Sequence, residues 1–390
     1  MPDIPSLLQS ARAGNAGFFL QFGGQAVPWL KELQKIYNEN QTVRSFIDIC
    51  IEAIHEELKN VEIPLSLNQG FDVNKWLTDE STIPAEEYLF QSSISMPMIH
   101  LTQMAHFRNL ISAGWERKDL IQFTRSATGH SQGMVTATFP ALDIEMENDI
   151  ECARKYAKYF FYLGIRSQEC FPNPWSTDAE NEESEQLGLK ENPSPMAAVL
   201  GADTNSVQKL VEENNKDAET EEQVYISLYN SPTNHILSST RKSLINFYKS
   251  NRSFFVENKV KFIFLKSTCP FHSPLMKGFN VNGFSEDLKR ISFNFSGTDI
   301  KFPVYSFADG RNIQNDKEIG LNMAEDITVR PLYWKKAIAS IPSSESITHI
   351  LDFGAGKAIQ RLSSEILLEM SCDKPVLSAV VPRDFKILTS

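Results

Sequence analysis

Residues 127 to 137 read ATGHSQGMVTA and contain a G-x-S-x-G pentapeptide centred on Ser131. A serine on a tight turn from a strand into a helix projects its hydroxyl clear of the backbone, and the glycines let the chain bend there. The backbone N–H of Gln132 points into the same space at the start of the helix and can stabilise a developing oxyanion. The motif predicts a nucleophilic serine, although a pentapeptide this short also occurs by chance in loops.

A serine nucleophile needs a general base, and His272 is the better candidate. It lies in CPFHSPLM (269–276), after a predicted buried strand and between two prolines, where a rigid loop can hold an imidazole. His130 is adjacent to the serine, but neighbouring side chains diverge on such a turn. Taken alone, a histidine such as His272 is more often structural than catalytic. The other histidines lie on predicted helix faces or at strand starts and are interpreted as structural: His55, His100, His106, His235 and His349.

Alternating strand and helix patterns around these two motifs predict an α/β protein. GFFLQFGGQ (17–25) and HILDFGAG (349–356) each indicate a strand that ends in a glycine turn, and KFPVYSF (301–307) indicates another strand. Helical spacing covers residues 28–59, 96–115, 150–165 and 358–368.

Residues 194 to 268 lie between the two motifs and follow the order strand, helix, strand, strand, helix, strand. This is the split-βαβ, ferredoxin-like arrangement. A lipase or esterase would place its histidine near the C-terminus, after the acid, so this layout fits an α/β-hydrolase enzyme poorly. The pattern predicts a large α/β subdomain, residues 1–193 and 269–390, interrupted by the ferredoxin-like one. Within the large subdomain, the acidic stretch 176–192 is interpreted as a solvated loop or disordered insertion.

Composition and charge argue against several classes of function. With 38 Lys+Arg against 49 Asp+Glu, the net charge is −11, which disfavours a general affinity for nucleic acid or anionic membranes. No apolar run approaches the roughly 20 residues of a spanning helix, and the N-terminal residues show no secretory signal. The five cysteines form no C-x-x-C pair. A cytoplasmic protein with reduced thiols and no metal site is therefore expected.

Together, these motifs resemble those of the malonyl/acyl-CoA:acyl carrier protein transacylase family, and within it the starter acetyltransferase domain of fungal-type fatty acid synthases. GHSQG with PFHS at this separation is far more specific than either motif alone. The matching stretches run in the family's order over nearly the whole chain: QFGGQ (21–25), GFDVNKWL (70–77), ATGHSQGMVTA (127–137), FFYLGIR (160–166), SPM (194–196), ISLYNSPTN (226–234), CPFHSPLM (269–276), FPVY (302–305) and ILDFGAG (350–356).

The resemblance implies a large α/β-hydrolase-like subdomain with a parallel sheet, and a Ser131–His272 dyad. Ser131 would take the acyl group from coenzyme A. His272 would act as base on Ser131 and then on the phosphopantetheine thiol of an acyl carrier protein. The oxyanion hole would use the backbone N–H groups of Gln132 and Gln25. Family members usually read G-Q-G at the latter turn, where this chain has Gln25-Ala26.

Further site residues follow from the same resemblance. In this family a backbone carbonyl orients the histidine, and the matching segment, RPLYW (330–334), points to Tyr333. Asn230 matches an asparagine that lines the site, for which a simple turn residue is the alternative. His130 and Phe271, next to the dyad residues, are expected to contact the substrate.

The acyl group is predicted from a departure from the family pattern. Malonyl-selective members carry an arginine in an R-G pair that clamps the malonyl carboxylate, whereas this chain has Leu163-Gly164. A leucine cannot pair with a carboxylate, so a short neutral acyl group, acetyl first, is predicted. Arg166, one helical turn further on, leaves malonyl transfer as an alternative. Two interpretations are equally plausible for three further residues, a place in the pocket wall or plain packing in the core: Phe160, Phe161 and Met134.

Two other functions use the same chain differently. A thioester hydrolase that removes stalled acyl groups would use the same residues, with water as acceptor. A non-catalytic docking scaffold in a fatty acid or polyketide synthase is the third possibility, against which the intact dyad argues. The expected partners are acyl-CoA and an acyl carrier protein, which is typically acidic and would need a local basic face. No metal or redox cofactor is implied.

Overall fold

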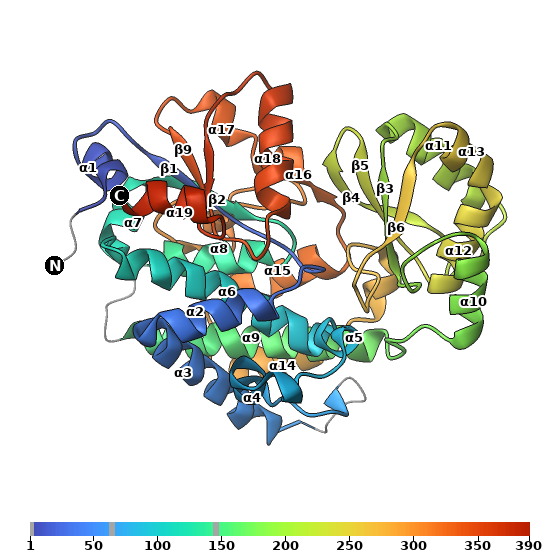
Figure 1. The fold of residues 1–390 in the computed structure, drawn as a ribbon, viewed down its shortest axis with the longest axis horizontal. Helices are drawn as coiled ribbons and strands as arrows, with labels where there is room; N and C mark the ends of the chain where they lie inside the picture. The colour runs from blue at the N-terminus through green and yellow to red at the C-terminus, as the bar shows by residue number, and fades with distance from the viewer. Residues whose placement is uncertain (1–3, 62–66, 143–147) are drawn as a thin grey trace.

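The computed structural model describes residues 4–61, 67–142 and 148–390, and its larger part is built on a parallel sheet (Figure 1). The strand order is β10-β9-β1-β2-β7, and every pairing in it is parallel. This confirms the predicted α/β class with a parallel sheet. The strands are β1 (Phe18–Phe22), β2 (Thr124–Gly129), β7 (Val304–Tyr305), β9 (His349–Asp352) and β10 (Val376–Ser378).

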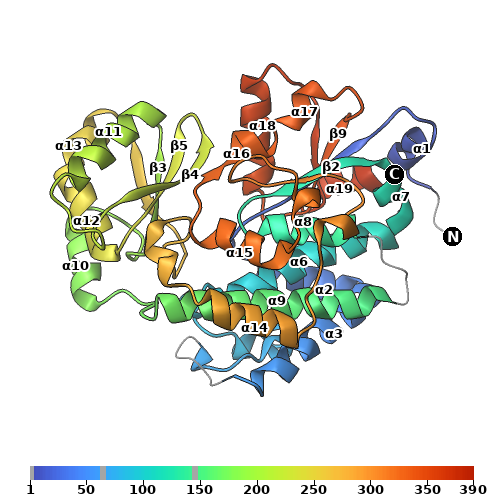
Figure 2. The ribbon, with the colours of Figure 1, turned by 180° about the vertical axis from the view of Figure 1, so that it is seen from behind.

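Long helices pack below this sheet in the view of Figure 1 and complete the core. α6 (Ser92–Ser112) crosses α9 (Asp149–Cys170) closely because Gly164 has no side chain: a Cβ there would lie 2.3 Å from the Ser92 carbonyl oxygen. α6 is buried on nearly all sides, which explains why residues 92–107 carry no charged side chain. Figure 2 shows α14 (Val281–Arg290) running alongside α9.

The other helices of the larger part cover the remaining surfaces of the sheet and of the helical layer. None of the helices within the described ranges is long and apolar enough to cross a membrane. The helices that cover the sheet and the helical layer are α1 (Ser6–Arg12), α2 (Leu30–Glu39), α3 (Gln41–Leu58), α4 (Val73–Thr78), α5 (Glu86–Leu89), α7 (Arg117–Phe123), α8 (Gly133–Ala141), α15 (Ile319–Thr328), α16 (Trp334–Ala337), α17 (Ser340–Ser343), α18 (Ala358–Glu369) and α19 (Pro382–Thr389).

Two predicted elements differ in extent from the observed ones. The helical region 28–59 is divided at Asn40, whose side chain accepts hydrogen bonds from the first turn of α3 and so starts a new helix there. The strand predicted over residues 301–307 shrinks to the two residues of β7. β7 lies at the edge of the sheet, where it pairs with Ala127 and Thr128 of β2, and Tyr305 also forms an isolated bridge with Asn312.

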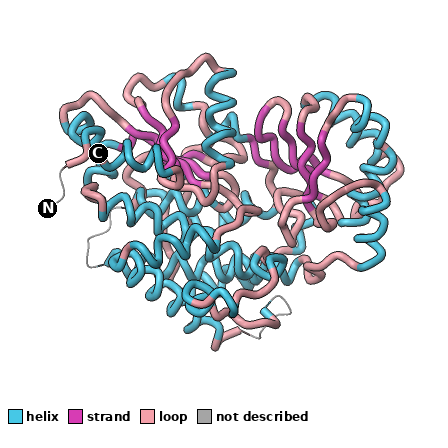
Figure 3. The backbone as a smooth tube through the Cα atoms, viewed as in Figure 1, coloured by secondary structure: helices cyan, strands magenta, loops and turns pink. Residues whose placement is uncertain are grey.

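A second sheet stands apart from the first and carries its own helices (Figure 3). Its order is β6-β3-β5-β4-β8, and the first four strands are antiparallel. In the segment's own numbering those four run 4-1-3-2, the strand order of the ferredoxin-like fold. The elements are β3 (Met196–Leu200), α11 (Thr204–Asn215), β4 (Tyr225–Ser231), β5 (Asn234–Ser238), α12 (Arg241–Ser250), α13 (Arg252–Glu257) and β6 (Lys261–Phe264).

The second sheet also takes a strand from outside residues 194–268. β8 (Leu332–Tyr333) pairs in parallel with β4 at the sheet edge. The two sheets are therefore joined at a place where the chain from the larger part extends the smaller one.

The interpretation of residues 176–192 as a solvated loop is wrong for its central part. Residues 178–186 form α10 (Asp178–Gln186), which begins with a capping box between Thr177 and Glu180. Arg241 binds Glu180, and Lys242 of α12 binds Glu183. The acidic side chains thus form a helix because basic residues of the ferredoxin-like segment lie opposite them.

Candidate active site

Ser131 lies on a sharp turn between the end of β2 at Gly129 and the start of α8 at Gly133. The turn needs both glycines. A Cβ on Gly129 would lie 1.8 Å from the carbonyl carbon of Gly133, and a Cβ on Gly133 would lie 2.4 Å from the carbonyl oxygen of Phe22. Ser131 itself has φ of 53°, in the left-handed region that non-glycine residues rarely adopt. The turn therefore has the geometry that the G-x-S-x-G motif predicts.

The structure brings Ser131 and His272 together from segments on either side of the ferredoxin-like subdomain. The hydroxyl oxygen of Ser131 lies 2.7 Å from Nε2 of His272, and both residues are buried. The ring of Phe307 packs edge-on against the imidazole, with ring centroids 5.2 Å apart. A contact of this length has the geometry that a nucleophile and its general base require.

The carbonyl that holds His272 belongs to Arg330, and the assignment to Tyr333 is wrong. Nδ1 of His272 lies 2.9 Å from the Arg330 carbonyl oxygen. Tyr333 is already part of β8, its N–H donates to the Phe307 carbonyl, and its ring stacks on Tyr229. The sequence did place the carbonyl in the right five residues. Only the path of the chain around Pro331 decides which of them faces the imidazole.

This contact sets the protonation of the imidazole. A carbonyl oxygen can only accept, so Nδ1 of His272 carries the proton and Nε2 is free to accept the Ser131 hydroxyl proton. Burial lowers the pKa of His272 to about 3, because the charged form is poorly solvated there. At neutral pH the residue is therefore uncharged and has its basic nitrogen toward the serine.

His130 contacts the ferredoxin-like segment through its imidazole. Its Nε2 lies 2.8 Å from Oδ1 of Asn230, and the Asn230 amide nitrogen donates to Asn234. Its ring lies 5.5 Å from that of Trp334. Burial lowers the pKa of His130 to about 4, so it too is neutral. Because it bonds Asn230, His130 links the serine turn to the second sheet instead of competing for the Ser131 proton.

The two backbone N–H groups expected to form an oxyanion hole belong to Gln132 and Gln25. Within the described residues, neither N–H donates a hydrogen bond to another group. The Gln132 side chain turns away and donates to the Met96 carbonyl. Ala26, where the G-Q-G pattern expected from the resemblance has a glycine, has φ of 62°. The loop thus takes a left-handed conformation despite the missing glycine, at the cost of backbone strain.

A cavity of about 270 Å³ opens beside the dyad, between the two sheets. Ser131, His272, His130, Asn230 and Phe271 all line it. Much of the remaining wall is apolar and comes from the second sheet and α18, with Met196, Ala198, Leu228, Ile236, Ile359 and Leu362. Among the described residues that line it, the one formally charged side chain is Arg361, which is exposed on α18. Sequence reasoning missed this residue, because an arginine on an amphipathic helix carries no signal of its own.

The structure does not bring Leu163 into this cavity. Leu163 is fully buried on α9 and is absent from the cavity wall. The same holds for Phe160, which stacks on His100 with ring centroids 4.4 Å apart and so packs the core. Phe161 and Met134 are likewise buried away from the cavity. Arg166 binds Asp287 and Glu169, so its guanidinium is already occupied.

Comparison with known proteins identifies the family to which this arrangement belongs. Residues 20–272 match the family described as starter unit:ACP transacylase in aflatoxin biosynthesis, where ACP is acyl carrier protein. The chain belongs to this family. The matched region holds both dyad residues, and the resemblance drawn from the sequence motifs is confirmed.

The relatives of this starter unit:ACP transacylase family member include a fungal fatty acid synthase subunit. The chain is 29% identical over 378 residues to the fatty acid synthase subunit beta of Saccharomyces cerevisiae. That alignment covers 90% of this chain but only 18% of the relative, so the chain corresponds to less than a fifth of that protein.

Solved structures share the fold of this transacylase family member. A crystal structure of MCAT from Streptococcus pneumoniae superposes with a TM-score of 0.65 at 17% identity, covering 95% of this chain and 99% of the other. A type II PKS acyl-carrier protein in complex with its malonyl-transacylase superposes with a TM-score of 0.67 at 15% identity, covering 96% and 99%. At these identities the likeness shows the fold alone.

Proposed function

We propose that this chain transfers a short neutral acyl group from coenzyme A to the phosphopantetheine thiol of an acyl carrier protein. The observation that carries the proposal is the 2.7 Å contact between Ser131 and a neutral His272 whose Nδ1 is held by a carbonyl. The family description, which names starter unit:ACP transacylases, supports this choice of acceptor. Acetyl is the acyl group that we favour, and the reaction passes through an acyl-Ser131 intermediate.

In the first half-reaction, Nε2 of His272 takes the proton as the oxygen of Ser131 attacks the thioester carbonyl. The N–H groups of Gln132 and Gln25 stabilise the oxyanion of the tetrahedral intermediate. The intermediate collapses when the C–S bond breaks, and the departing coenzyme A sulfur takes the proton from His272. In the second half, His272 deprotonates the carrier's thiol, which attacks the ester and releases Ser131 with its proton restored.

The cavity between the sheets gives the pantetheine chain a place to lie. Its wall is mostly apolar from the second sheet and α18, and it ends at the Ser131 turn. Arg361 is the formal positive charge on its wall and lies on the exposed side of α18. Both coenzyme A and phosphopantetheine carry a phosphate at the far end of this chain. We therefore assign Arg361 to that phosphate, which a guanidinium binds well.

A neutral acyl group fits the charges around the dyad. A malonyl carboxylate would need a cation in the cavity wall near Ser131, and Arg166 is paired with Asp287 and Glu169. Leu163 keeps its predicted role only if the acyl group reaches α9. Leu163→Arg tests this with an acyl-CoA panel: a gain with malonyl-CoA places the acyl group beside α9, and a folded variant with no gain moves the selectivity position elsewhere.

Mass spectrometry after incubation with acetyl-CoA tests the proposed reaction directly. We expect one acetyl group on the wild type, on the peptide that contains Ser131, and none on Ser131→Ala. Added holo-carrier protein should remove the group from the enzyme and gain it. An unmodified wild type, or equal labelling of the wild type and Ser131→Ala, would contradict the proposal.

The same assay separates the alternative functions. Release of free acetate faster than transfer to the carrier protein identifies a thioester hydrolase, and absence of any turnover leaves a docking scaffold. The proposed chemistry uses only side chains and backbone groups of this chain, so we expect chelators to leave the rate unchanged. The described cysteines are free thiols, which supports a reducing compartment such as the cytoplasm.

A further inference from the structure

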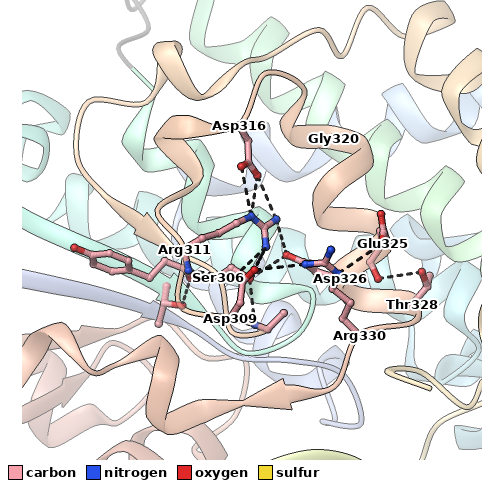
Figure 4. Close-up of polar contacts among 12 residues, drawn as sticks. Ser306, Asp309, Arg311, Asp316, Gly320, Glu325, Asp326, Thr328 and Arg330 are labelled. Atoms are coloured by element: carbon pink, nitrogen blue, oxygen red, sulfur yellow. Dashed lines mark hydrogen bonds and ion pairs between the residues drawn. The ribbon is translucent and has the colours of Figure 1, made fainter. Parts of the chain in front are cut away.

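A buried carboxylate lies behind the catalytic histidine. Asp326, in the last turn of α15, is only 1% exposed. Its Oδ2 accepts from the Arg311 guanidinium at 2.8 Å and from the Ser306 hydroxyl at 3.0 Å. Its Oδ1 has no hydrogen-bond partner among the described residues and faces the Arg330 guanidinium at 3.5 Å (Figure 4). Asp326 therefore contacts two residues of the segment after β7, and it also contacts Arg330, whose carbonyl binds His272.

Further charges complete this cluster, as Figure 4 shows. The Arg311 guanidinium also binds Asp309 and Asp316, each at 3.2 Å. The Arg330 guanidinium lies 3.5 Å from both Asp309 and Glu325. These three acidic residues are more exposed than Asp326. Solvent can replace the ion pairs of Asp309 and Glu325, which are 44% and 56% exposed, so each of these two contributes little by itself. Asp326 is buried, so solvent cannot replace its ion pairs.

Three hydrogen bonds tie His272 and its neighbour Ser273 to the segment that follows Asp326. The N–H of His272 donates to the Ile327 carbonyl at 3.3 Å, and the next N–H donates to the Thr328 carbonyl at 3.2 Å. Nδ1 of His272 donates to the Arg330 carbonyl at 2.9 Å. The ring of Phe307, which packs on the imidazole, follows Ser306 directly.

We propose that Asp326 is a positioning residue that fixes His272 through the Arg330 carbonyl. Leaving a buried carboxylate unpaired is strongly unfavourable, so the end of α15 and the segment that carries Arg311 stay together. The Arg330 carbonyl is then held in line with Nδ1, which keeps Nε2 free as the base. A displacement of about 1 Å in such a group can cost about 100-fold in rate. This inference rests on the proposed function, in which His272 is that base.

Asp326→Asn tests the proposal because it keeps the shape of the side chain and removes its charge. We expect kcat of acyl transfer to fall about 10- to 100-fold, with KM for acyl-CoA changed less than about twofold because the cavity wall is untouched. The matched control is Asp309→Asn, which removes a more exposed carboxylate from the same two arginines. It should change kcat less than about threefold. An Asp326→Asn kcat equal to that of the wild type would overturn the proposal.

A readout that needs no turnover separates this proposal from the proposed function. In ¹⁵N NMR spectra, wild-type His272 should show the proton on Nδ1, and Asp326→Asn should shift population toward the Nε2–H form. If the wild type forms no acyl-Ser131, the proposed function fails. If it does and the tautomer is unchanged in Asp326→Asn, this inference fails.

A second variant covers the case in which Asp326→Asn does not fold. Ser306→Ala removes a hydroxyl that donates to Asp326 and accepts from the Ala308 N–H and the Arg311 guanidinium. It should lower kcat about threefold or more, with KM unchanged, because Asp326 loses a donor and Arg311 loses an acceptor that helps to hold it against Asp326. A folded Ser306→Ala with wild-type kcat would contradict the proposal.

Discussion

Ser131 and His272 are 141 residues apart, yet they share a left-handed backbone, with φ of 53° and 58°, at the point where their side chains meet. Ala26, also on the cavity wall, has φ of 62°. These three are half of the six non-glycine residues with positive φ in the described ranges. Each such residue costs roughly 1–3 kcal/mol. Stability is thus lost at the site in order to aim the hydroxyl and the imidazole at each other.

Ser131→Gly should be more stable than Ser131→Ala by about 1 kcal/mol. Both variants remove the hydroxyl, and only alanine keeps a Cβ in the left-handed conformation. Urea unfolding gives the two free energies, and both variants should be inactive in acyl transfer. Equal stabilities would mean that the turn relaxes and that no strain is held at Ser131.

Gly133→Ala should destabilise the fold by about 3 kcal/mol or more. The added Cβ would lie 2.4 Å from the carbonyl oxygens of Phe22 and Gly23, which are backbone atoms at the end of β1 and cannot move independently. The control is Gly278→Ala, whose Cβ would lie 3.3 Å from the Cys170 sulfur and which should cost less than about 1 kcal/mol. Thermal unfolding compares the two. A similar cost for both would show that the serine turn tolerates a side chain.

The free energy of unfolding should decrease as the pH is lowered from about 6.5 toward 4. Burial lowers the pKa of His100 to about 3, as it does for His272, and that of His130 to about 4. In the unfolded chain a histidine titrates near about 6.5, so below that pH the unfolded state binds more protons. Each histidine then removes about 1.4 kcal/mol of stability per pH unit.

One buried carboxyl acts in the opposite direction. Burial raises the pKa of Asp352 to about 6, so its contribution is present at low pH and is lost as pH rises toward 6. It offsets about one of the three histidines. Urea unfolding at pH 7, 6 and 5 measures the slope, and His100→Gln should reduce it by about 1.4 kcal/mol per pH unit. A stability independent of pH over this range would mean that these histidines titrate normally in the fold.

Arg361→Ala should raise KM for acyl-CoA about 5- to 20-fold and leave kcat nearly unchanged, because a charge-assisted hydrogen bond to a phosphate contributes about 1–2 kcal/mol to binding. Lys357→Ala, at the start of the same helix and outside the cavity wall, is the matched control. Steady-state kinetics with acetyl-CoA measures both. Equal KM values for the two variants would show that Arg361 does not bind the phosphate.

The two residues of the dyad, and the order of strands and helices along residues 194–268, could be predicted from the sequence because both depend on local patterns. The turn around Ser131 needs two glycines at fixed spacing, and such spacing is visible in the chain itself. The segment 194–268 alternates strand and helix patterns that admit few arrangements. The acidic composition of residues 178–186 hides a helix that only the capping box between Thr177 and Glu180 indicates in the sequence.

The sequence by itself determined the α/β class, the family, and the identity of the serine and the histidine. Tertiary structure alone decided that Arg330, not Tyr333, supplies the carbonyl at His272, and that Leu163 lies outside the cavity. The reason is physical. Neighbours along the chain set the shape of a turn, but the atom that faces an imidazole depends on how α15, β8 and the segment after β7 pack together.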